Sequence, residues 1–185
     1  YSHRIIQPDH PIMRNINTRF DVPHSRYNEI NRDQLEKAGL TVLAESDAAG
    51  VHMAVSPDQI RAVYFQGHPE YDFNSLLKEY KREVIRFQLD EISEAPPFPD
   101  NYFPEEAKKI ADTYIDEIIH SKNAKDSDAI FPEDQLNIFV DNTWGDTAKA
   151  IFNNWLGLVY SLTSHDRLKQ YMEGIDKQNP LGILK

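Results

Sequence analysis

The chain has 185 residues, enough for one domain or a large part of one at roughly 100–200 residues per domain. Its 40% hydrophobic and 27% charged residues are typical of a soluble globular protein, and no apolar run approaches the ~20 residues of a membrane helix. The net charge of −10 argues against nucleic acid as a partner, and the absence of cysteine excludes disulfides, thiolate metal sites and a cysteine nucleophile within these residues.

The first half of the chain is expected to form short strands and turns. A strand is predicted at residues 5–6, just before two prolines. The β-branched run 40–44 and the alternating residues 50–55 predict a hairpin. Residues 61–66 predict a further strand, which ends at Gly67.

Helices are expected in the middle of the chain. Apolar residues recur at helical spacing over 73–87, and Arg82 falls on the opposite, polar face. Residues 92–104 contain four prolines and are predicted to be irregular. A second helix is expected to begin at Glu105, where acidic residues favour the positive end of the helix dipole.

The last part of the chain combines a polar loop with an apolar helix. Residues 123–132 are predicted to form a solvated loop, in which Asp126 and Asp128 lack the glycine of a calcium loop. Residues 147–162 predict a helix that is apolar almost all round and therefore buried, with Asp146 as its cap. The mixture of strands and helices indicates an α/β or α+β domain.

The sharpest candidate for chemistry follows the strand that ends at Gly67. In open α/β sheets, ligands bind beyond the carboxyl ends of strands. His68 can act as a general base near neutral pH, and Glu70, two residues on, is expected on the same side to orient the imidazole. By spacing alone, a turn histidine beside a surface glutamate is the more common explanation.

Two further candidate sites would bind a substrate rather than react with it. Ser25 and Arg26 follow a proline, where the hydroxyl can bond a polar substrate and the guanidinium a carboxylate. Arg82 could also hold a carboxylate if its helix lies across the site. An ordinary polar loop and a solvated helix face are the alternatives. The remaining histidines show no metal-ligand spacing, so no metal is expected.

Three segments together resemble the homoserine O-acyltransferases of methionine biosynthesis, the succinyl- or acetyl-transferring family with a class I glutamine amidotransferase-like α/β sandwich fold. The matching segments occur in the order Pro23-His24-Ser25-Arg26-Tyr27, Gly67-His68-Pro69-Glu70-Tyr71-Asp72 and Asn101-Tyr102-Phe103-Pro104. A joint match in this order is far more specific than any one segment. The resemblance covers nearly the whole chain, except that residues 105–143 form an insert relative to the family.

The resemblance implies a role for each matching residue. A cysteine thiolate takes the acyl group from acyl-CoA, and the homoserine hydroxyl then attacks the acyl-enzyme. His68 matches the catalytic histidine and Glu70 the third member of the triad. Ser25 and Arg82 match positions that bind the acceptor, and Arg26 is a further candidate for binding. The family also implies a cytoplasmic homodimer with acyl-CoA as co-substrate and no other cofactor.

The family's cysteine would lie upstream of Tyr1, so residues 1–185 are expected to be the C-terminal half of a single domain. The chain is then a piece of a longer enzyme, a separately encoded half that pairs with a cysteine-bearing segment, or a non-catalytic remnant that binds an amino acid. Serine instead of homoserine as the acceptor is a further alternative, because the same carboxylate-binding and hydroxyl chemistry serves both.

Overall fold

The computed structural model describes residues 1–124 and 130–184, which fold as a mixture of helices and one antiparallel sheet. The chain divides into two compact units. The first unit comprises Tyr1–Glu70 and Thr143–Lys185, and the second unit comprises Tyr71–Asn142. Asp126 and Asp128 of the predicted loop lie outside the described residues.

A five-stranded sheet with the order β2-β1-β3-β4-β5 forms the centre of the first unit. Every pairing in this sheet is antiparallel, and β3 and β4 form the predicted hairpin. The rule that ligands bind beyond the carboxyl ends of parallel strands therefore does not apply to these residues. The strands are β1 (Ser2–Ile5), β2 (Arg19–Asp21), β3 (Thr41–Ser46), β4 (Gly50–Val55) and β5 (Val63–Phe65).

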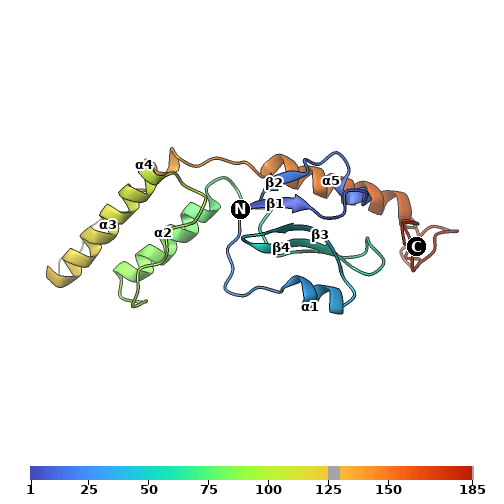
Figure 1. The fold of residues 1–185 in the computed structure, drawn as a ribbon, viewed down its shortest axis with the longest axis horizontal. Coiled ribbons are helices and arrows are strands. Elements are labelled where there is room, and N and C mark those ends of the chain that lie inside the picture. Colours follow the sequence, from blue (N-terminus) through green and yellow to red (C-terminus); the bar gives the residue numbers. More distant parts are fainter. Residues whose placement is uncertain (125–129, 185) are drawn as a thin grey trace. The chain divides into compact units, whose positions relative to one another are not determined.

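Helices cover both faces of this sheet (Figure 1). On one face, α5 (Gly145–Leu162) packs with the short 3₁₀ helix η1 (Pro11–Met13) over Leu43 and Met53. On the other face, α1 (Arg32–Lys37) places Leu35 against the same hairpin. Successive strand residues point to opposite faces, so one hairpin contributes to both cores.

The expectation of a helix buried all round was wrong for α5. The apolar core reaches only the stripe formed by Ile151, Trp155 and Leu158. On the opposite side, Phe152 is 57% and Tyr160 76% exposed. A helix that packs on one sheet face can bury only one stripe of its surface. The predicted cap was also wrong, because Trp144 occupies that position and Asp146 lies in the first turn.

Four short elements were not anticipated, namely β2, η1, α1 and α4 (Glu133–Asn137). Helix α1 carries a recognisable signal, a capping box in which Asn31 accepts from the Gln34 backbone and the Gln34 side chain accepts from the Asn31 backbone. At η1, His10 caps the backbone N–H of Ile12 through its Nδ1. Elements of three to six residues present too little periodicity to be found from a pattern.

The second unit is helical and is built around α2 (Ser75–Gln88), α3 (Glu105–Ala124) and α4 (Glu133–Asn137). Its core combines apolar residues from all three helices. The helices predicted over 73–87 and from Glu105 are thus confirmed, and residues 92–104 are irregular as their prolines require. Within the described ranges 1–124 and 130–184, no helix has the length and apolar character that crossing a membrane requires.

Replacement of Leu43 should destabilise the first unit, because its side chain is fully buried between α5 and the sheet. We expect Leu43→Ala to lower the free energy of unfolding by about 2–5 kcal/mol, measured by chemical denaturation. Leu168→Ala is the matched control, since Leu168 is 94% exposed. Equal losses in the two variants would contradict the assignment of the core.

Candidate active site

The predicted contact between His68 and Glu70 is present. The Nδ1 atom of His68 lies 2.9 Å from Oε1 of Glu70, and because a carboxylate only accepts, Nδ1 donates. The other ring nitrogen, Nε2, lies 3.1 Å from the backbone oxygen of Ser25. A protonated ring donates to both oxygens, whereas a neutral ring satisfies only one. Because Nδ1 donates to Glu70, Nε2 is the nitrogen of the neutral ring that can accept a proton, as a general base requires.

The backbone holds His68 in place more firmly than the carboxylate does. Glu70 is 67% exposed, and exposed ion pairs contribute only about 0–1 kcal/mol. By contrast, the N–H of His68 donates to the Pro23 oxygen at 2.8 Å. Just before it, a side chain at Gly67 would lie 2.6 Å from Val22 and 2.7 Å from His24, so only glycine permits this approach.

The structure thus brings three of the predicted residues together, namely His68, Glu70 and the backbone of Ser25. Arg82 lies in the second unit, with its side chain 62% exposed as its polar face predicts, and its Nε donates to Glu83 at 2.9 Å. Its role in acceptor binding stays a prediction, as do the roles of Ser25 and Arg26.

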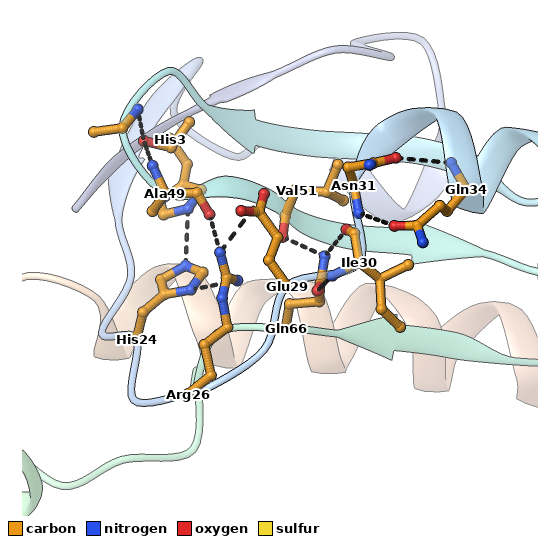
Figure 2. A network of polar contacts seen from close by, with 12 residues as sticks. His3, His24, Arg26, Glu29, Ile30, Asn31, Gln34, Ala49, Val51 and Gln66 are labelled. Carbon is orange, nitrogen blue, oxygen red and sulfur yellow. Dashed lines mark hydrogen bonds and ion pairs between the residues drawn. The ribbon is translucent and has the colours of Figure 1, made fainter.

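The guanidinium of Arg26 contacts other groups of the first unit (Figure 2). Its Nη1 donates to Nδ1 of His24 at 3.0 Å, and its Nη2 donates to the Ala49 oxygen at 2.5 Å. Glu29 adds an ion pair at 3.9 Å. The Arg26 side chain is only 19% exposed, so these contacts fix the loop after Pro23 against the turn between β3 and β4.

A second tether fastens the same loop. The side-chain nitrogen of Gln66 donates to the oxygens of Ile30 and Val51, and its side-chain oxygen accepts from the N–H of Ile30 (Figure 2). Gln66 immediately precedes the Gly67 turn. The segment that carries Ser25 and the segment that carries His68 are therefore fastened to each other at both ends.

Sequence reasoning missed a chain of histidines beside this turn, of which His3 and His52 are buried and His24 is half-buried. Nδ1 of His3 lies 2.9 Å from the Tyr1 oxygen, and Nε2 of His3 lies 3.0 Å from Nε2 of His24. His52 is 1% exposed, and its ring centre lies 5.3 Å from that of His3. Strand order brings these distant positions together, and a single sequence carries no signal for it. Among the described residues, no group of histidines and carboxylates is arranged to hold a metal ion.

Hydrogen bonding determines which nitrogen carries the proton in this chain. A carbonyl only accepts, so Nδ1 of His3 donates to Tyr1 and its Nε2 must accept. His24 therefore donates from Nε2, and its Nδ1 accepts from Arg26. Both rings are neutral in this scheme, because a second proton on either would set two donors against each other.

Burial supports the neutral state of these rings. Desolvation lowers the pKa of His3 to about 4 and that of His24 to about 3, with further lowering of the His24 pKa by the nearby His3 and Arg26. Burial also lowers the pKa of His10 to about 4 and holds the pKa of His52 well below its usual value.

Lowering the pH should therefore destabilise the first unit. In the unfolded chain these histidines take up protons near pH 6.5, whereas in the folded chain they do so only near pH 4 or below. The stabilisation is complete above pH 6.5 and is lost as the pH falls toward 4, because the unfolded state binds more protons. Chemical denaturation across this window should show the fall, with a shallower slope in His10→Gln. A stability independent of pH there would contradict the buried neutral state.

Comparison with known proteins identifies the family. Residues 1–165 match the family model described as homoserine O-succinyltransferase. The chain therefore belongs to the homoserine O-succinyltransferase family, and the resemblance seen in its three segments is confirmed.

Curated relatives agree with this assignment. The homoserine O-succinyltransferase of Methylococcus capsulatus is 54% identical over 183 residues, which cover 99% of this chain and 52% of the relative. The enzymes of the same name from Methylobacter tundripaludum and Nitrosococcus oceani are each 52% identical over 183 residues, covering 99% of this chain and 52% and 51% of the respective relatives. The chain thus spans about half the length of the curated relatives that it matches.

Proposed function

We propose that this chain provides the general base and acceptor-binding residues of a homoserine O-succinyltransferase. The observation that carries the proposal is the 2.9 Å contact between His68 and Glu70 in a member of this family. The names of the relatives favour a succinyl over an acetyl donor, and homoserine over serine as the acceptor. Succinyl-CoA is then the co-substrate, and the reaction needs no other cofactor.

In the first step of the proposed reaction, His68 activates a cysteine thiol. The nucleophile belongs to polypeptide beyond these 185 residues, because the chain contains no cysteine. Nε2 of His68 takes the thiol proton, and the sulfur attacks the thioester carbon of succinyl-CoA. The bond from that carbon to the sulfur of CoA breaks, and the departing thiolate takes the proton from His68. The product is a succinyl-enzyme.

In the second step, homoserine takes up the succinyl group. His68 removes the proton from the hydroxyl, whose oxygen attacks the acyl carbon, and the cysteine leaves and regains the proton. Glu70 stabilises the imidazolium in both steps and holds the ring in its tautomer. Arg82 binds the α-carboxylate of homoserine, for which a planar guanidinium is suited, and Ser25 bonds its polar groups.

The proposal extends to the whole domain. Residues 1–185 form the C-terminal half of a class I glutamine amidotransferase-like sandwich, acting in the cytoplasm as part of a homodimer. The insert at 105–143 contains α3 and α4, which share the core of the second unit with α2. This packing supports an insert that is built into the fold rather than a loose extension.

The base should be indispensable for turnover. We expect His68→Ala in the complete native protein to lower kcat for CoA release with succinyl-CoA and homoserine by about 10²–10⁴-fold, the usual contribution of a general base. His165→Ala is the matched control, because His165 is exposed in the first unit and lies outside the proposed site. Near-normal turnover by His68→Ala would overturn the proposed role, and failure of the unaltered protein to transfer succinate would overturn the proposed function.

A further inference from the structure

The histidine chain, in which His3 is buried and His24 half-buried, ends next to the proposed base. The chain comprises Tyr1, His3, His24 and Arg26, linked by contacts of 2.9, 3.0 and 3.0 Å between successive members (Figure 2 shows the last three). None of its side chains takes part in the proposed chemistry of the sulfur and the hydroxyl. The polar groups of this chain hydrogen-bond to one another. A polar network whose members are all paired in this way favours one arrangement of its side chains.

The ring of His24 touches the turn that carries His68. A Cβ on Gly67 would lie 2.7 Å from Nε2 of His24, so the ring lies directly against this backbone. The two residues beside His24 in the sequence lie in contact with His68 itself. Pro23 accepts the N–H of His68 at 2.8 Å, and the Ser25 oxygen lies 3.1 Å from its Nε2. Displacement of His24 would therefore move both contacts of His68 at once.

Arg26 fixes His24 in turn. Its two terminal nitrogens bond different partners, His24 and the Ala49 oxygen, so the guanidinium joins the loop to the β3–β4 turn. An arginine suits this bridge because its donors are held in a rigid plane. With Glu29 alongside at 3.9 Å, the positive charge is also balanced within the first unit.

We propose that His24 is a positioning residue for the general base, held in a single neutral tautomer between His3 and Arg26 so that its ring and its two neighbours set the place of the His68 ring. This inference rests on the proposed function of His68. In this proposal, Arg26 holds His24 through a hydrogen bond and does not contact the substrate. A base displaced by about 1 Å can lose about 10²-fold in rate, so the expected effect falls on kcat.

The test uses the complete native protein with succinyl-CoA and homoserine. His24→Leu removes both polar atoms of the ring and should lower kcat about 10–100-fold, with the KM of each substrate changed by less than about twofold. His24→Gln retains a donor and an acceptor and should recover a large part of the loss. His10→Leu is the matched control, because His10 is a buried histidine that caps η1 in the same unit, and the kcat of this variant should be unchanged.

A second readout does not depend on activity. Hydrogen exchange in His24→Leu should accelerate at residues 22–27 and 66–70, which contain the His68 N–H bond, and should not change in β3 and β4. Uniform acceleration across the first unit would show a loss of stability only and would overturn the proposal. An unchanged kcat in His24→Leu, or a kcat loss as large in His10→Leu, would overturn it as well.

A variant of Arg26 distinguishes a role in positioning from a role in substrate binding. Arg26→Lys keeps the charge but cannot bond His24 and Ala49 in one plane, so positioning predicts a lower kcat with an unchanged KM for homoserine. A raised KM for homoserine with an unchanged kcat would instead show that Arg26 binds the substrate. If the unaltered protein transfers no succinyl group, the proposed function fails, and the exchange pattern alone decides whether His24 positions the turn.

Discussion

The contact between His68 and Glu70 is the interaction on which the account depends, and by itself it is weak. Both side chains reach solvent, so their pairing contributes about 0–1 kcal/mol and cannot hold a ring in one place. The surrounding backbone supplies the precision that the pair lacks. The hydrogen bond from the His68 N–H to Pro23 and the close packing of Val22 and His24 against Gly67 fix the backbone of the turn. The carboxylate of Glu70 then only has to orient the ring.

This precision depends on a set of buried and half-buried histidines that must stay neutral. Their rings occupy positions where apolar side chains would avoid the cost of burying polar atoms. His3 and His24 reduce that cost by bonding to one another and to groups of fixed polarity, Tyr1 at one end and Arg26 at the other. The same bonds leave only one arrangement of protons, which makes the turn beside them rigid.

Sequence patterns predicted the parts of this fold that local chemistry determines. The hairpin of β3 and β4, the helices α2 and α3, and the contact of His68 with Glu70 follow from alternation, periodicity and two-residue spacing. The meeting of His3 with His24 depends on strand order, which no local pattern encodes. The exposed side of α5 depends on how much of a helix one sheet face can cover, and its apolar sequence alone suggested full burial.

The central claim is that His68 takes the proton of a cysteine thiol, whose sulfur then carries the succinyl group. Detection of this covalent intermediate tests the claim most directly. The complete native protein can be mixed with succinyl-CoA in the absence of an acceptor and examined by mass spectrometry of the intact chain and its peptides. The account predicts one succinyl group on a cysteine, which disappears when homoserine is added, and no such adduct in His68→Ala. An unaltered protein that transfers succinate without a cysteine adduct, or that carries it on another residue, would contradict the account.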